Sequence, residues 1–214
     1  MTEQEFALEL NKLGLNLTEE KASSLNKFYE ILIAKNQYMN LTRITTKEDV
    51  YLKHFYDSLT LFKALDLSKF QTLCDVGSGA GFPGIVLKIF FPNLDITLID
   101  ARQKRVDYLN EVIKKLDLKN IKAYHIRAED LIKKQAKFDI VTARAVASLP
   151  KLLNWTMPLV KPSGYFLAMK GNIETELKEA LPLFKKYHYH LDDEITFNLP
   201  IEQSQRTILK ISKY

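Results

Sequence analysis

The glycine-rich stretch between Asp75 and Gly84 constrains the fold of this chain more than any other segment. It follows an apolar segment near residues 71–76 and precedes a second one that ends at Asp100. A chain that passes from strand to helix within a few residues needs backbone with positive φ, which glycine adopts at low cost. The positions that fit this need are Gly77, Gly79 and Gly81. Pro83 suits the start of a helix, because its φ is already helical, so the stretch predicts a strand, a tight loop and a helix.

Two acids around this loop indicate which cofactor it would hold. Residues 79–84 also match G-x-G-x-x-G, so a nicotinamide or flavin dinucleotide is the first alternative. A pyrophosphate on backbone N–H groups gains from positive potential, which Asp75 would reduce. S-adenosylmethionine carries an ammonium and a sulfonium instead, and an acid favours both. Asp100 lies about 20 residues after the glycines, where it can accept hydrogen bonds from ribose hydroxyls. The pattern favours S-adenosylmethionine and a methyltransferase over an ordinary turn.

The chain has the bulk properties of a globular intracellular protein. Its 214 residues, 46% of them apolar, allow one large domain or one domain with a helical appendage. Cys74 is the only cysteine, so no disulfide can form within the chain. The acidic start and the absence of a long uncharged apolar run predict no signal peptide and no membrane span. We therefore expect a cytoplasmic protein, a monomer, with no membrane partner and no metal.

Hydrophobic periodicity divides the chain at about residue 67. Residues 1–67 show helical spacing, with a capping box at Thr2 and Glu5 and a further helix from Thr46 to about Leu65. Residues 68–214 alternate between strand and helix patterns. The expected strands lie near 71–76, 95–100, 121–126, 138–143, 163–169, 188–198 and 206–212, and the expected helices near 83–90, 102–116, 150–159 and 174–187. This predicts a mostly parallel seven-stranded α/β sheet with helices on both faces, a final antiparallel hairpin and an N-terminal helical extension.

Ligands of such sheets bind beyond the carboxyl ends of the strands, so residues that follow each strand are site candidates. Glu129 follows the third strand and suits the adenine side of a pocket, although an acid in the first turn of a helix is an equal alternative. Arg144 interrupts an apolar stretch, where a guanidinium group needs a partner or a function. The other candidates at strand ends are Asp75, Gly77, Asp100, Ala101, Ala128 and Lys170.

Positive charge is concentrated in the second part of the chain. Residues 1–70 hold 9 Lys or Arg and 10 Asp or Glu, whereas residues 71–214 hold 22 and 16. A basic surface near a cleft suits a polyanion such as RNA, and an ordinary solvated surface is the alternative. Candidate RNA contacts are Asn40, Arg43, His54, Lys170 and Arg206.

The combined motifs resemble the RsmG (GidB) family of bacterial 16S ribosomal RNA guanine-N7 methyltransferases. They are Asn40-Leu-Thr, His54-x-x-Asp57-Ser58, Asp75 to Ile85, Arg127-Ala-Glu129, Arg144-Ala-Val-Ala147 and Lys170-Gly171. The resemblance implies a Rossmann-like class I methyltransferase fold and a 16S ribosomal RNA or small-subunit substrate. It implies S-adenosylmethionine contacts from Gly77, Phe82, Asp100, Ala128, Glu129 and Arg144, with Asp75, Ser78, Gly79 and Ala101 as secondary candidates. This chain has Ala101 where the family commonly has serine after the acid, which removes a side-chain contact there.

Guanine N7 has no proton to remove, so its methylation needs alignment and charge tolerance rather than a general base. Accordingly, the fourth strand lacks the Asp/Asn-Pro-Pro motif of amine methyltransferases, and Cys74 precedes the cofactor loop, away from a nucleophile's place. A small-molecule methyltransferase is the main alternative, and a non-enzymatic RNA-binding protein is the other. For His54, Asp57 and Ser58, a polar latch between helices and sheet and a wall of the substrate entrance both stay open.

Overall fold

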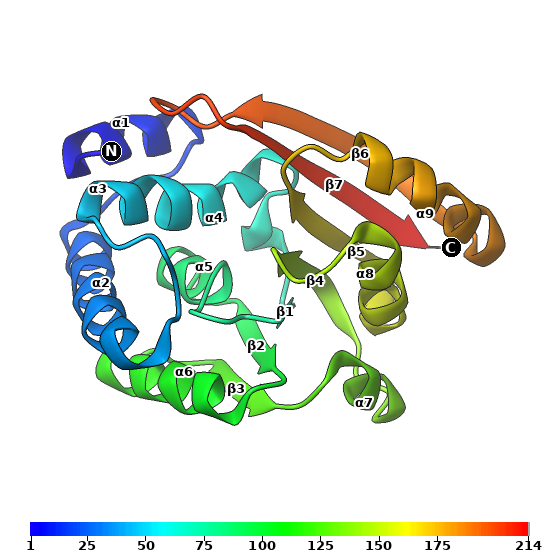
Figure 1. Cartoon of the computed structure of the whole chain (residues 1–214), viewed down its shortest axis with the longest axis horizontal. Coiled ribbons are helices and arrows are strands. Elements are labelled where there is room, and N and C mark those ends of the chain that lie inside the picture. The colour runs from blue at the N-terminus through cyan, green and yellow to red at the C-terminus, as the bar shows by residue number, and fades with distance from the viewer. Residues whose placement is uncertain (214) are drawn as a thin grey trace.

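A single sheet of seven strands forms the centre of the computed structural model, which describes residues 1–213 (Figure 1). Its strand order is β3-β2-β1-β4-β5-β7-β6. The first five strands pair in parallel, and β7 is antiparallel to both of its neighbours. The strands are β1 (Thr72–Val76), β2 (Asp95–Asp100), β3 (Ile121–His125), β4 (Phe138–Arg144), β5 (Val160–Lys170), β6 (Tyr189–Asn198) and β7 (Gln205–Lys213). The expected mostly parallel sheet with a closing hairpin is confirmed.

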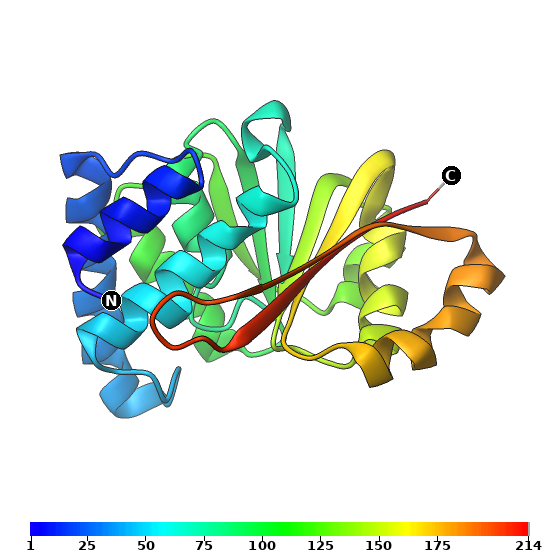
Figure 2. The same cartoon turned by 90° about the horizontal axis from the view of Figure 1, so that it is seen from above.

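Helices cover both faces of this sheet, each over its own apolar core (Figure 2). The helices of the first face are α1 (Glu3–Lys12), α2 (Glu19–Met39), α3 (Lys47–Val50), α4 (Asp57–Leu59), α5 (Gly84–Phe90) and α6 (Gln103–Lys115). Those of the second face are α7 (Ala128–Lys133), α8 (Leu149–Thr156) and α9 (Glu174–Tyr187). Because the connections change face between β1 and β4, the sheet has its switch point there, where ligands of such folds bind.

The N-terminal helices pack into the same core as the sheet. Phe28 of α2 contacts Phe82 of the glycine loop, with ring centroids 5.2 Å apart. The predicted capping box at Thr2 is present. The predicted helix from Thr46 is continuous but irregular, because a π-helix, η1 (Tyr51–Tyr56), joins α3 to α4, and a 3₁₀ turn (Thr60–Lys63) ends it. The division into residues 1–67 and 68–214 stays a prediction, since one apolar cluster spans both parts.

The glycine loop has the predicted backbone. Gly77, Gly79 and Gly81 have φ of 75°, 55° and 96°, and the helix after Pro83 runs over Gly84–Phe90. Two expectations need correction. Helix α7 was not among the expected helices, because it has only six residues. Strand β5 starts at Val160 rather than near 163, since Pro162 lies within it, where a proline argues against a strand.

Candidate functional site

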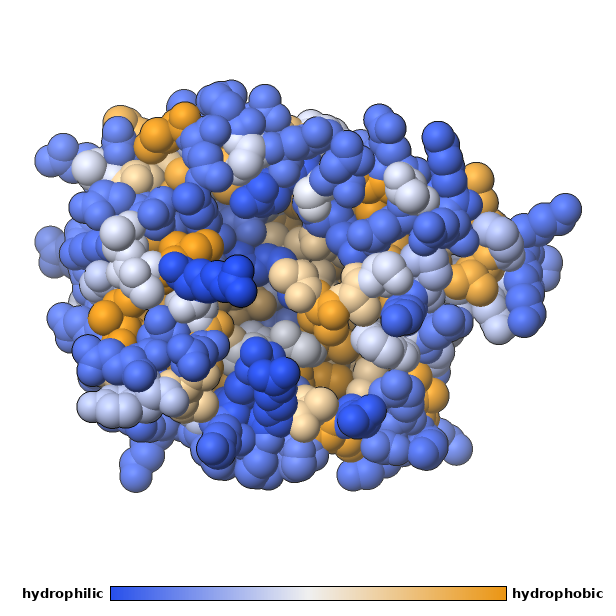
Figure 3. Space-filling model, viewed as in Figure 1, coloured by the Kyte–Doolittle hydropathy of each residue, from blue (hydrophilic) through white to orange (hydrophobic). Residues whose placement is uncertain are grey.

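Two cavities open at the carboxyl edge of the sheet, on either side of Ala145 and Val146, which follow β4. The first has a volume of about 250 Å³ and lies over the ends of β1, β2 and β3. The second has a volume of about 360 Å³ and lies between η1, β5 and β7. Val146 lines the first cavity and Ala145 the second. Figure 3 shows the face of Figure 1 hollowed near its centre, with apolar surface inside and hydrophilic residues around it. The cavities are therefore adjacent and separated by one turn of chain.

Apolar side chains and two carboxylates line the first cavity. Its lining residues are Val76, Gly77, Ile99, Asp100, Ala101, Ile126, Arg127, Ala128, Glu129, Val146 and Trp155. Flat apolar walls suit an aromatic base, and acceptor groups at the rim suit hydroxyl donors. The sequence predicted Gly77, Asp100, Ala101, Ala128 and Glu129 as neighbours, and the structure brings these together. It missed Val146 and Trp155, whose place depends on the course of the chain after β4.

The carboxylate of Asp100 is fixed in place by backbone groups. Its Oδ2 accepts a hydrogen bond from the Gly79 N–H at 3.0 Å, and its Oδ1 accepts one from the Arg102 N–H at 2.9 Å. The Arg105 guanidinium lies 3.4 Å from Oδ2. Only 4% of Asp100 is exposed, yet it borders the cavity. Oδ2 thus has two donors and Oδ1 has one, so the second lone pair of Oδ1 can still accept a hydrogen bond from a ligand.

The glycine loop has almost no backbone donor left for a phosphate. The N–H groups of Gly77 and Ser78 donate to the Ile99 carbonyl, and that of Gly79 donates to Asp100. Further along, the N–H groups of Gly81 and Phe82 donate to the Ser78 carbonyl. A dinucleotide site needs such donors free at a helix N-terminus. The structure therefore argues against a pyrophosphate here and fits a cofactor held by acceptors.

Asp75 closes the N-terminus of α5 from inside the protein. Its Oδ2 accepts a hydrogen bond from the Gly84 N–H at 3.0 Å, and the side chain is fully buried. Its Oδ1 is the one buried side-chain oxygen or nitrogen within residues 1–213 that lacks a partner. Burial raises the pKa of Asp75 to about 7. The expected contact between Asp75 and a ligand is thus absent from the cavity walls, because the carboxyl group points into the core beneath the loop.

The second cavity is built around one carboxylate shared by two arginines. Asp57 Oδ2 accepts a hydrogen bond from Arg144 Nη1 at 2.8 Å, and Oδ1 accepts one from Arg206 Nε at 3.0 Å. Arg144 also donates to the Lys53 carbonyl. These contacts join η1 to β4 and β7, which are distant in the sequence. The other lining residues are Ile44, His54, Thr60, Ala145, Met169, Lys170, Gly171, Phe197, Thr207 and Ile208.

His54 is held neutral in a single tautomer by its neighbours. Arg144 Nη2 lies 3.1 Å from His54 Nδ1 and can only donate, so Nδ1 accepts and the proton is on Nε2. Nε2 then donates to Thr42 Oγ1 at 2.9 Å. Burial, and then the positive charge of Arg144, lower the pKa of His54 to about 3. Its ring also stacks on Phe82 at 4.3 Å, so it is both a latch and a cavity wall.

Three predicted site residues line the second cavity. Arg144 was predicted to contact the cofactor, but it lines the second cavity and pairs with Asp57. Lys170 and Arg206 are predicted RNA contacts, and both line the second cavity. There Lys170 pairs with Glu176 at 2.7 Å and is 10% exposed, and Arg206 pairs with Asp57. Their role as RNA contacts stays a prediction.

The remaining predicted residues lie around the cavities without lining them. Ser78 and Phe82 belong to the glycine loop and are buried. Asn40 ends α2 in a left-handed conformation, and Arg43 is exposed in the loop that follows. Residues 1–213 contain no group of three or more His, Cys, Asp or Glu side chains placed to hold a metal ion. No helix in this range is long and apolar enough to cross a bilayer.

We expect Gly77→Ala to weaken cofactor binding at least tenfold. A Cβ at Gly77 would lie 2.7 Å from Val146 Cγ2, so Val146 must move into the cavity. The double variant Gly77→Ala/Val146→Ala removes the atoms in conflict and should recover most of the affinity, measured by calorimetry. Gly14→Ala is the matched control, since its φ is also positive at 76° but nothing lies within 4 Å. A double variant as weak as the single one would contradict this steric explanation.

The chain is similar to known proteins over its whole length. The family described as GidB, rRNA small subunit methyltransferase G, matches residues 21–199. The chain belongs to this family. It is 43% identical to the ribosomal RNA small subunit methyltransferase G of Lysinibacillus sphaericus (strain C3-41), covering 100% of this chain and 91% of the relative. It is 41% identical to the protein of that name from Listeria monocytogenes serovar 1/2a, with the same coverage.

A solved structure shows the same fold at low sequence identity. The M. jannaschii TYW2 structure in complex with AdoMet has a TM-score of 0.55, with 17% identity over 74% of this chain and 77% of that one. The Rossmann-like class I methyltransferase fold is thus confirmed.

Proposed function

We propose that this protein transfers a methyl group from S-adenosylmethionine to N7 of a guanine in 16S ribosomal RNA of the small subunit. The single observation that carries the proposal is the pair of adjoining cavities at the switch point of a family-typical sheet. One cavity has acceptors and apolar walls, and the other has arginines. Membership of the family of small-subunit ribosomal RNA methyltransferases supports the substrate.

The first cavity has the chemistry to hold S-adenosylmethionine. Asp100 would accept hydrogen bonds from ribose hydroxyls, and Ala128 and Trp155 provide apolar surface for adenine. The blocked donors of the glycine loop disfavour a phosphate-bearing cofactor. When bound, S-adenosylmethionine supplies an electrophilic methyl group on a sulfonium.

The second cavity would then receive the target base. His54 is a weak base, because burial and Arg144 lower its pKa to about 3 and Arg144 already donates to its Nδ1. N7 methylation requires no base, because N7 carries a free lone pair. The Asp57 carboxylate in this cavity is held between Arg144 and Arg206, so it fixes the positions of both arginines. We infer that the cavity contributes mainly by aligning the base with the methyl group, which is a large source of rate gain when no proton has to be removed.

Labelled methyl transfer tests the proposal directly. Purified protein should label small ribosomal subunits or a 16S transcript, and mapping should place the label on guanine N7. Label found only on small metabolites would support the alternative of a small-molecule methyltransferase. A label on RNA at another atom would overturn the N7 assignment.

We expect Asp100→Ala to weaken S-adenosylmethionine binding by roughly 10- to 100-fold, because a charge-assisted hydrogen bond contributes about 1.5–3 kcal/mol. Isothermal titration calorimetry measures this change, and circular dichroism reports whether the fold persists. Asp117→Asn is the control, since the Asp117 side chain is 84% exposed and far along the chain from the cavity. An unchanged affinity for S-adenosylmethionine would contradict the assigned role of Asp100.

A further inference from the structure

All six arginines of this chain lie at or beside the two cavities: Arg43, Arg102, Arg105, Arg127, Arg144 and Arg206. Some line a cavity, and the others contact a lining residue or are next to one in the sequence. Arginine recognises phosphate through a planar, permanently charged fork of donors, which lysine lacks. The concentration of arginine therefore marks this edge as a surface for an anionic partner.

These arginines divide into two groups by their partners. Arg105, Arg144 and Arg206 each pair with a buried aspartate and are at most 31% exposed. The side chains of the other three are exposed and make no hydrogen bond or ion pair within residues 1–213: Arg43, Arg102 and Arg127. Arg127 acts only through space on Asp130, whose carboxylate pairs with Lys133. The first group organises the site, and the second is free to bind.

Hydrogen bonds hold the backbone at or next to each of these three arginines. Asn36 of α2 holds Thr42 by two hydrogen bonds of 2.9 Å, one from its side-chain amide and one to it. Thr42 also accepts a hydrogen bond from His54, which lines the second cavity. The residue before Arg43 is therefore held against that cavity. The Arg102 N–H donates to Asp100, and Arg127 is the N-cap of α7 beside the first cavity. An anion that binds these side chains would meet a backbone that is already ordered.

We propose that Arg43, Arg102 and Arg127 bind backbone phosphates of the RNA on either side of the target nucleotide. The inference rests on the proposed function and replaces the paired Lys170 and Arg206 as the phosphate contacts. Arg43 directly precedes Ile44 of the second cavity, Arg102 directly follows Ala101 of the first cavity, and Arg127 lines the first cavity. An RNA strand that reaches both cavities would therefore pass all three arginines. Two acids lie beside Arg127: Glu129, which faces the first cavity, and Asp130, which pairs with Lys133.

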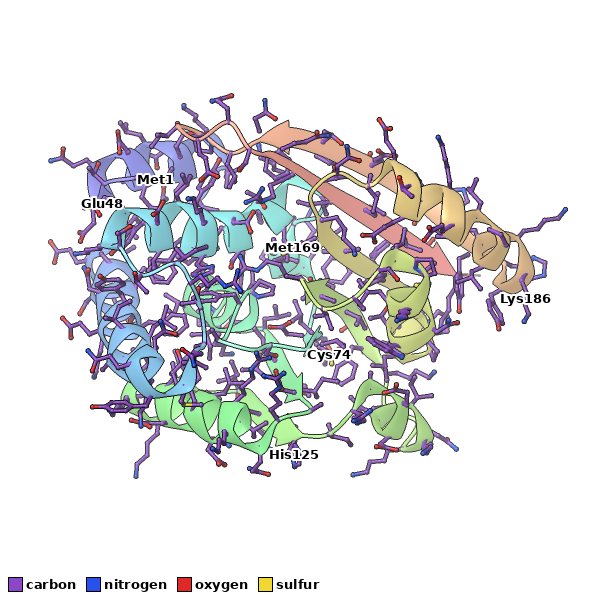
Figure 4. All side chains as sticks on the ribbon, viewed as in Figure 1. Met1, Glu48, Cys74, His125, Met169 and Lys186 are labelled. Atoms are coloured by element: carbon purple, nitrogen blue, oxygen red, sulfur yellow. The ribbon has the colours of Figure 1, made fainter. Side chains whose placement is uncertain are left out.

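The test is a salt series of RNA binding with matched triple variants. The variant Arg43→Gln/Arg102→Gln/Arg127→Gln removes three rim charges. The control Lys178→Gln/Lys185→Gln/Lys186→Gln removes three exposed charges from α9, whose end at Lys186 lies far from Met169 of the second cavity in Figure 4. Filter binding to a 16S ribosomal RNA transcript gives the dependence of log affinity on log salt, and calorimetry gives S-adenosylmethionine affinity.

We expect the arginine variant to lower the magnitude of the slope by about 2–3, because each lost phosphate contact accounts for roughly 0.7–0.9. The lysine control should keep the wild-type slope and the wild-type affinity for S-adenosylmethionine. An unchanged slope in the arginine variant overturns the inference and leaves these arginines for another partner, such as an acidic protein. Because Arg127 also lines the first cavity, the salt slope and not the cofactor affinity of the arginine variant decides the outcome. Wild-type protein that neither binds nor methylates RNA would instead refute the proposed function.

Discussion

Replacing Asp57 by alanine is expected to lower the free energy of unfolding by about 3–5 kcal/mol, because it leaves two guanidinium groups without their counter-charge. Asp57 is 4% exposed, and the side chains of Arg144 and Arg206 are 14% and 26% exposed, so water compensates the loss poorly. The same change removes the ion pairs that join α4 to strands β4 and β7. Urea unfolding followed by circular dichroism measures the effect.

Two further variants keep this prediction testable. Asp57→Asn retains the shape and one of the two acceptor oxygens but not the charge, so it should lose less than the alanine variant. Asp130→Ala breaks an exposed pair with Lys133 and should cost at most about 1 kcal/mol. A loss as small in Asp57→Ala as in Asp130→Ala would mean that solvent screens the Asp57 cluster. The cluster would then have no structural importance.

Local sequence signals predicted the fold because they act over a few residues. Positive φ at Gly77 requires glycine whatever surrounds it, and the pattern of apolar residues distinguishes strand from helix. The missing helix between β6 and β7 also predicted their hairpin correctly. The sequence did not predict helix α7 or the π-helix η1, because so short a segment shows no periodicity.

The sequence could not predict contacts between residues that are far apart along the chain. The partner of Arg144 lies 87 residues before it, and that of Arg206 lies 149 residues away. No local pattern shows that both arginines pair with Asp57. The first cavity was better predicted, because its residues directly follow strands β1, β2 and β3, whose ends must meet at one edge.

Asp75→Asn is expected to change how stability depends on pH, by about 4 kcal/mol between pH 4 and pH 8. Burial raises the pKa of Asp75 from 3.8 to about 7, so between these values the folded state holds a proton that the unfolded state has released. Stability from this group is therefore present at pH 4 and is lost as pH rises through 7. Asparagine does not titrate, so the free energy of unfolding of the variant should increase relative to that of wild type as pH rises. Urea unfolding at intervals from pH 4 to pH 8 measures the difference, in which all other titrating groups cancel.

Asp139→Asn provides a control of opposite sign. Burial acts to raise the pKa of Asp139, but hydrogen bonds from Lys161 and Thr72 outweigh it and hold the pKa below 3.8. That carboxylate therefore stabilises the fold above pH 4, and its loss should cost more at pH 8 than at low pH. If Asp75→Asn also becomes less stable relative to wild type as pH rises, then Asp75 is ionised and paired in the folded protein. The carboxyl group beneath the glycine loop would then be a charge that the fold uses, and its unpartnered oxygen would have found a donor.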